Sequence, residues 1–176
     1  QVGPGGSLRV MLELMGTDIL ISKFADEVLR VSAEKFPGAT FIDVGDPAGG
    51  QRGDKDVRTS IDILRERGIR VATRRYPKKR LIELLEAKFG QFRKVGDARL
   101  PMIVVSKKGC PILIEGLMGG YCWPKARDGK ISRELPLEDG YYEHLQDCLQ
   151  YTAAHVWLGG AAVSTPVTIR EARWRF

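Results

Sequence analysis

Two aspartates, Asp46 and Asp147, are the side chains best suited to do chemistry in this chain. Asp46 follows the apolar run 39–44, which is typical of a buried strand and stops at Gly45-Asp46-Pro47. A carboxylate at such a strand end lies where α/β folds usually build their sites. Asp147 lies in the predicted helix 141–157. The pair is suited to a divalent metal ion, although a turn aspartate and a solvated helix aspartate would show the same spacing.

Phosphodiester hydrolysis is the chemistry that clustered carboxylates serve. Two Mg²⁺ or Mn²⁺ ions about 3.5–4 Å apart activate the attacking water and stabilise the leaving oxygen. Hard cations bind hard oxygen ligands such as those of Asp. Such a site usually needs more carboxylates, and Asp43, Glu13 and Glu115 are the alternatives. Each of these is expected to be structural or solvated, and Asp43 has the opposite strand parity to Asp46.

Helical spacing places Asp147 at the edge of a buried face. The predicted packing face of helix 141–157 consists of Leu145, Cys148, Leu149, Thr152 and Val156. His144, Asp147 and Tyr151 follow a neighbouring stripe, from which Asp147 could point into a cleft beside the sheet. His144 is a candidate accessory residue, although a single histidine is weak evidence and a surface position is the expectation.

The net charge of +6 favours a polyanionic partner, most simply nucleic acid. Basic residues flank Asp46 and occupy the predicted hairpin 121–136. The candidates for contacting double-stranded DNA are Arg52, Lys55, Lys125, Arg127, Lys130 and Arg133. Any one of them is more simply a solvated surface residue, but together they suit backbone contacts without base reading. The glycine-rich run 45–53 lacks the Lys-Ser/Thr ending of a nucleotide-binding loop.

Alternating strands and helices are expected to position these residues. The expected order is a turn at 3–6, strand 8–14, helix 19–36, strand 39–44, helix 56–67, strand 69–72, helix 79–89, strand 101–105, helix 110–118, hairpin 121–136, helix 141–157 and tail 159–176. This order predicts parallel strands joined by crossover helices. The 176 residues, 43% of them apolar and 28% charged, are expected to form a single domain. No apolar stretch is long enough to span a bilayer.

Five stretches of the sequence occur in the same order as the motifs of a known protein family. They are GGSLRV (5–10), VGDPAGGQR (44–52), TSIDIL (59–64), GLMGGY (116–121) and HLQDCLQY (144–151). Together they resemble the C-terminal nuclease domain of large terminase subunits, the DNA-packaging motors of tailed bacteriophages. The resemblance covers nearly the whole chain, and the Gly-Asp-Pro-Ala-Gly stretch is fairly specific.

The resemblance implies an RNase H-like α/β fold, in which helices flank a mixed central sheet that carries an extra β-hairpin. It also implies a carboxylate site for two Mg²⁺ or Mn²⁺ ions. Asp46 and Asp147 match two of the family's catalytic, metal-binding aspartates. The third belongs on the first strand, which is expected upstream of Gln1 because this chain has no Asp before Asp18. No ATPase motor motif is present, so the resemblance concerns the nuclease half.

By the same resemblance, the partners are double-stranded DNA, the portal protein, the small terminase subunit and the ATPase domain of the same polypeptide. The expected location is the host cytoplasm, where virions assemble. The leading hypothesis is an endonuclease that cuts concatemeric viral DNA with little sequence preference. A second is a non-catalytic DNA-binding or assembly module, favoured by the missing third carboxylate. A third, a generic RNase H-like resolvase, fits the long hairpin and the Gly-Asp-Pro-Ala-Gly stretch less well.

Overall fold

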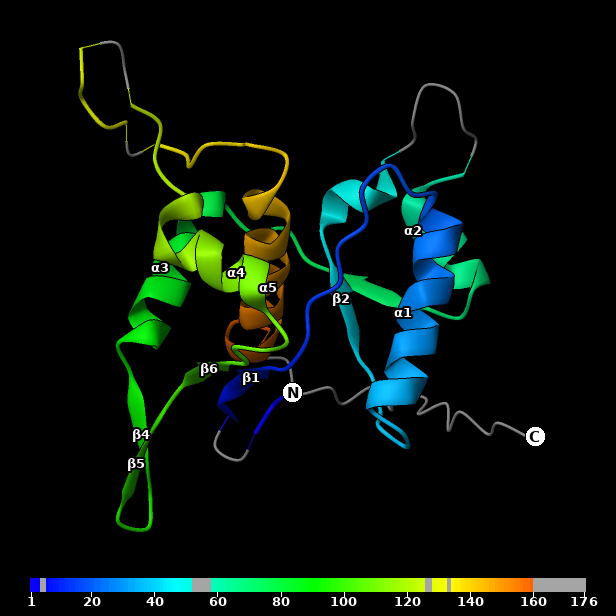
Figure 1. The fold of residues 1–176 in the computed structure, drawn as a ribbon, viewed down its shortest axis with the longest axis horizontal. Coiled ribbons are helices and arrows are strands. Elements are labelled where there is room, and N and C mark those ends of the chain that lie inside the picture. The colour runs from blue at the N-terminus through cyan, green and yellow to red at the C-terminus, as the bar shows by residue number, and fades with distance from the viewer. Residues whose placement is uncertain (4–5, 52–57, 126–127, 133, 160–176) are drawn as a thin grey trace. The chain divides into compact units, whose positions relative to one another are not determined.

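A computed structural model describes residues 1–3, 6–51, 58–125, 128–132 and 134–159 (Figure 1). It has a mixed α/β architecture in which helices accompany short strand pairs. Among the described residues the strands form three separate pairs, two parallel and one antiparallel. The described residues divide into two compact units: unit 1 contains those of Gln1–Glu13 and Arg75–Gly160, and unit 2 contains those of Leu14–Arg74.

A parallel strand pair lies at the start of unit 1. β1 (Leu8–Val10) runs beside β6 (Ile103–Val105), and Leu8 lies opposite Ile103. Both of these side chains are buried. The sequence predicts a longer first strand, 8–14. The observed strand is shorter because its partner β6 is itself short, and the apolar side chains that follow it are exposed.

The expected turn before β1 is present. The Gly3 amide donates to the Ser7 carbonyl at 2.7 Å, and Val2 forms an antiparallel bridge with Leu8. Residues 4–5 within this turn lie outside the described residues. A short incoming segment therefore pairs with β1.

A β-hairpin in unit 1 was not expected from the sequence pattern. β4 (Phe92–Val95) pairs antiparallel with β5 (Ala98–Pro101). Gly96 between them has a φ of 58°, a conformation that glycine adopts without steric cost. The Gly-Asp pair joining the strands is the signal that predicts such a turn.

The three helices expected in unit 1 are confirmed. They are α3 (Lys78–Phe89), α4 (Pro111–Glu115) and α5 (Tyr142–Trp157), and a π-helical turn, Gly116–Gly120, continues α4. α5 packs against both α3 and α4. At Gly116 the π-helical turn comes so close to α5 that a Cβ there would lie 2.5 Å from the Gln146 Nε2. Any larger residue at this position would require the Gln146 side chain to shift.

The packing face predicted for α5 is correct in part. Leu145 and Leu149 are buried as expected, but Cys148 is exposed. In its place the helix buries Gln146 and Gln150. The buried face is therefore rotated from the predicted one, away from Cys148 and toward the side of α5 that carries Gln146 and Gln150.

The described part of unit 2 contains one parallel strand pair and two α-helices. Its elements are α1 (Ile21–Lys35), β2 (Asp43–Gly45), a 3₁₀ turn (Pro47–Gly50), α2 (Ser60–Glu66) and β3 (Val71–Thr73). β2 and β3 are parallel, which confirms the expected crossover arrangement. Thr59 and Asp62 form a capping box that starts α2, where the Thr59 hydroxyl accepts from the Asp62 amide and the Asp62 carboxylate accepts from the Thr59 amide.

The expectation of a buried strand over 39–44 is wrong. The strand begins only at Asp43, and Phe41 and Ile42 are 48% and 52% exposed. An apolar run indicates a tendency toward burial, but it does not reveal whether a partner strand is long enough to cover it. Here the partner β3 is short.

The predicted hairpin 121–136 is confirmed as an antiparallel bridge between Lys125 and Ile131. Ser132 donates its amide to the Pro124 carbonyl at 3.0 Å, and Gly129 has a φ of 80°. Within the described part of this segment no strand extends from the bridge.

In the part of the chain that the structure describes, no helix is long and apolar enough to cross a membrane.

Candidate functional site

Asp46 lies in unit 2 at the end of β2, as the sequence predicts. It is the N-cap of the 3₁₀ turn Pro47–Gly50, and its Oδ1 accepts a hydrogen bond from the Ala48 amide at 2.8 Å. The Asp-Pro pair starts this turn because the Asp oxygen satisfies an amide that the turn leaves open, while Pro fixes φ at the first position. Asp46 is exposed.

Asp147 lies in unit 1 on α5, and it is half-buried rather than solvated. Its Oδ1 accepts a hydrogen bond from the Nζ of Lys78, which belongs to α3. The exposed fractions of the two side chains are 28% for Lys78 and 32% for Asp147. The ammonium also lies 5.9 Å from the ring centroid of Tyr121. α3 and α5 therefore hold a partly shielded ion pair between them.

The pKa of Lys78 is raised by this environment. Burial of the ammonium opposes its charged form, but the hydrogen bond and negative charge of Asp147, helped by Tyr121, outweigh that effect. Lys78 is therefore protonated at neutral pH. The ion pair holds a full positive charge against the Asp147 carboxylate.

Three carboxylates line one cavity beside this ion pair. The cavity has a volume of about 200 Å³. Its lining residues are Lys78, Tyr121, Leu135, Pro136, Glu138, Glu143 and Asp147. The Oε2 of Glu143 is buried and has no hydrogen-bond partner among the described residues. The cavity is acidic, because one ammonium faces three carboxylates.

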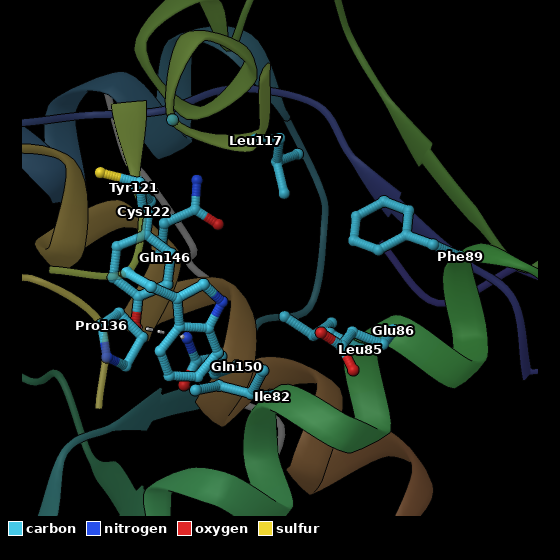
Figure 2. A pocket seen from close by; sticks show the side chains of 12 residues that line it. Ile82, Leu85, Glu86, Phe89, Leu117, Tyr121, Cys122, Pro136, Gln146 and Gln150 are labelled. Carbon is cyan, nitrogen blue, oxygen red and sulfur yellow. Dashed lines mark hydrogen bonds between the residues drawn. The ribbon is translucent and has the colours of Figure 1, made fainter. Parts of the chain in front are cut away.

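A second cavity in unit 1, of about 220 Å³, is mainly apolar (Figure 2). Side chains of α3, among them Ile82 and Phe89, form one side of it. Two buried amides from α5 form another: Gln146 donates its Nε2 to the Leu113 carbonyl at 3.1 Å, and Gln150 donates to the Tyr121 hydroxyl at 3.4 Å. Tyr121 lines both cavities.

Lys78, Glu138 and Glu143 were not expected as site residues. Glu143 and Asp147 are four positions apart on α5, a spacing that places both side chains on one helix face. That spacing is the signal from which Glu143 could have been found. Lys78 lies in the basic run 74–80, and nothing in the run itself distinguishes Lys78 from its neighbours.

Two of the alternative carboxylates, Glu13 and Glu115, form hydrogen bonds with other parts of the fold. Both oxygens of Glu13 accept amide hydrogen bonds at 2.8 Å, from Ile112 and Leu113, and so cap the first turn of α4. Glu115 accepts from the Tyr142 hydroxyl at 3.4 Å.

Asp43 is half-buried in β2. Burial raises the pKa of its carboxyl, against the opposing effect of a hydrogen bond from the Arg70 amide. The side chain is therefore placed where its charged form is disfavoured.

The candidate DNA-binding residues divide into two sets. Lys125 and Lys130 are described, and Lys130 is exposed with its Nζ 3.2 Å from the Asp128 Oδ2. Arg52, Lys55, Arg127 and Arg133 lie outside the described residues. His144 is exposed, with its Nδ1 3.9 Å from the Glu143 Oε1, which matches the expected surface position.

Asp46 and Asp147 belong to different units, so their sharing of a metal stays a prediction. Within the described ranges, no group of three or more His, Cys, Asp or Glu side chains is arranged to hold a metal ion. In comparisons with known proteins, the chain matches no family model, no curated protein and no solved structure. Function is therefore inferred from the residues of this chain and the geometry around them.

Proposed function

We propose that this chain is the nuclease domain of a tailed-bacteriophage terminase large subunit with an RNase H-like fold. In this proposal it is a metal-dependent endonuclease that cuts concatemeric double-stranded viral DNA in the host cytoplasm. The observation that carries the proposal is the half-buried Asp147, which lines an acidic cavity on α5. The Gly-Asp-Pro-Ala-Gly stretch supports it, because Asp46 in that stretch is an exposed carboxylate at a strand end.

The donor chemistry of unit 1 fits Mg²⁺ or Mn²⁺. Asp147, Glu143 and Glu138 offer only oxygen donors, the kind that both ions prefer. In the proposal, Asp147 on α5 and Asp46 at the end of β2 would each be a ligand to a divalent cation. When bound, two such ions activate a water molecule and stabilise the leaving oxygen of a phosphodiester.

Two lysines of the hairpin segment 121–136 would orient the DNA. Lys125 forms the bridge of the hairpin segment and Lys130 precedes its partner Ile131, and from there both can contact phosphates without reading bases. The other proposed partners are the portal protein, the small terminase subunit and the ATPase domain of the same polypeptide. These partners are proposed on the resemblance alone.

The test is cleavage of a plasmid by the intact protein with Mg²⁺ or Mn²⁺. Asp46→Asn and Asp147→Asn are expected to lower the cleavage rate by a factor of about 100 or more, because an amide keeps the shape of the side chain but loses the charge that binds a hard cation. Asp97→Asn is the matched control, because Asp97 is an exposed aspartate in the turn between β4 and β5, outside the residues proposed to bind metal or DNA. Thermal melting of each variant checks that the fold is retained.

Undiminished cleavage by both Asn variants would refute the proposal. Loss of cleavage in the Asp97→Asn control as well would show that the assay does not report on the proposed site.

A non-catalytic DNA-binding or assembly module is the second candidate function. It is favoured by the ion pair with Lys78, which already occupies the Asp147 carboxylate. In that case the intact protein would bind duplex DNA with an affinity that falls as salt rises. It would show no metal-dependent cleavage under any condition that supports binding.

A further inference from the structure

Asp147 already has a cation beside it. The ammonium of Lys78 donates to its Oδ1, and both residues belong to helices that pack against each other within unit 1. Leu81 on α3 and Leu149 on α5 are buried, so both helices are anchored in the core of unit 1. Only the flexible side-chain stem of Lys78 can move the ammonium away.

The cavity around this pair carries more negative than positive charge. Glu138 and Glu143 line it together with Asp147, while Lys78 is the only basic residue among the described residues of the lining. The buried Oε2 of Glu143 has no hydrogen-bond partner among the described residues. A buried carboxylate oxygen needs a donor or a cation, so the cavity can accommodate positive charge beyond that of Lys78.

We propose that Lys78 is the resident counter-ion of Asp147 and controls the access of a divalent cation to that carboxylate. This inference rests on the proposed function and adds a regulating residue to it. One oxygen of Asp147 cannot keep a close ammonium and also bind a metal ion at coordination distance. A cation therefore binds to Oδ1 only when the ammonium leaves, and the charge of the ammonium opposes a cation at the other oxygen as well, so Lys78 weakens the apparent affinity of the site for metal.

A purely structural role for Lys78 gives a different result. If Lys78 only joined α3 to α5, its removal would lower stability and leave metal affinity unchanged. If Lys78 competes with the metal, its removal raises metal affinity whatever happens to stability.

The experiment is a titration of the full chain with Mn²⁺ alone, without DNA, followed by calorimetry and by electron paramagnetic resonance of the free ion. Lys78→Met is expected to bind Mn²⁺ about fivefold more tightly than the wild type, the size expected for loss of a partly exposed ion pair. Lys79→Met is the matched control on the same helix, because the Lys79 side chain is 79% exposed. Its affinity is expected to equal that of the wild type.

A second variant covers the case in which Lys78→Met does not fold. Lys78→Gln removes the charge but keeps a side-chain N–H that can donate to Asp147. It is also expected to tighten Mn²⁺ binding. Circular dichroism of each variant identifies the samples that are folded.

The Asp147→Asn variant separates failure of this inference from failure of the proposed function. If Asp147→Asn abolishes Mn²⁺ binding while folded Lys78→Met and Lys78→Gln bind as the wild type does, Lys78 does not compete with metal and only this inference is overturned. If Asp147→Asn binds Mn²⁺ as tightly as the wild type, or if no variant binds it, Asp147 is not a metal ligand and both proposals are overturned.

Discussion

The two units hold their structures by different means. Unit 1 buries large apolar side chains from three helices and a strand pair, namely Leu8, Leu81, Leu85, Ile103, Leu113, Leu145 and Leu149. In the described part of unit 2 the buried apolar side chains are Ala25, Val31 and Ile69. Unit 2 has instead a capping box and surface ion pairs such as Arg67–Asp26. Burial dominates in unit 1, and local polar bonding contributes a larger share in unit 2.

The two candidate aspartates follow the same division. Asp147 is attached to a helix that is packed on two sides, and its partner Lys78 comes from another helix. Asp46 is held by an amide two residues away in its own turn. A side chain on a packed helix keeps its position against solvent fluctuations, whereas one on an exposed turn depends on the stability of that turn.

The largest expected effect is in the core of unit 1. Leu81→Ala is expected to lower the free energy of unfolding by about 2–5 kcal/mol, because it removes a large buried side chain and leaves a cavity. Val31→Ala in unit 2 is expected to cost about 1–2 kcal/mol. Urea unfolding followed by circular dichroism measures both. Equal costs would remove the distinction between the two units.

The next largest loss of stability is expected from the removal of a polar contact within unit 1. Glu13→Ala is expected to destabilise the protein by about 1.5–3 kcal/mol, because the carboxylate accepts two amide hydrogen bonds at the start of α4. Glu83→Ala on the exposed side of α3 is the control and is expected to change stability by less than about 0.5 kcal/mol. A cost for Glu13→Ala no larger than that of the control would show that the cap contributes nothing.

A smaller effect is expected at the capping box of unit 2. Thr59→Ala is expected to cost about 1 kcal/mol, since it removes the side-chain oxygen that accepts the Asp62 amide. Hydrogen exchange should show faster opening of α2 amides, while the amides of α5 are unaffected. Equal acceleration in both helices would mean that the two units unfold as one.

The smallest expected effect is a gain in folding stability, whereas the preceding substitutions lower it. Burial raises the pKa of Asp43, so the folded state holds that proton more tightly than the unfolded chain does. Charged Asp43 therefore costs stability above its folded pKa, and the cost disappears as the pH falls below the unfolded value. Asp43→Asn is expected to stabilise the protein by less than about 1 kcal/mol at pH 7 and to have no effect at strongly acidic pH. Thermal melting across pH measures this, and a stabilisation that persists in acid would contradict it.

The helices could be predicted from the sequence and the strands only in part. Helix 79–89 and helix 141–157 match α3 and α5 to within a residue at each end, because their apolar positions recur at helical spacing. The strands are shorter than the apolar runs at 8–14 and 39–44. The length of a strand depends on its partner, and sequence patterning does not reveal which partner a strand will have.

The candidate site could be predicted only to the level of single residues. Asp147 was expected at the edge of a buried face, and it is half-buried there. Its pairing with Lys78 depends on how α3 crosses α5, which no periodicity in either helix specifies. Glu138 precedes α5 outside any regular element, so no spacing rule relates it to the other carboxylates.

The discontinuity of unit 1 has a consequence for how the chain folds during synthesis. The hydrogen bond between Glu13 and Ile112 joins residues 99 positions apart, and β1 likewise needs β6. At typical synthesis rates, on the order of 5–20 s separate the emergence of the two ends of such a contact from the ribosome. The segment Leu14–Arg74 emerges as one continuous stretch within that interval. Vectorial synthesis therefore favours the folding of unit 2 while the first strand of unit 1 still waits for its partner.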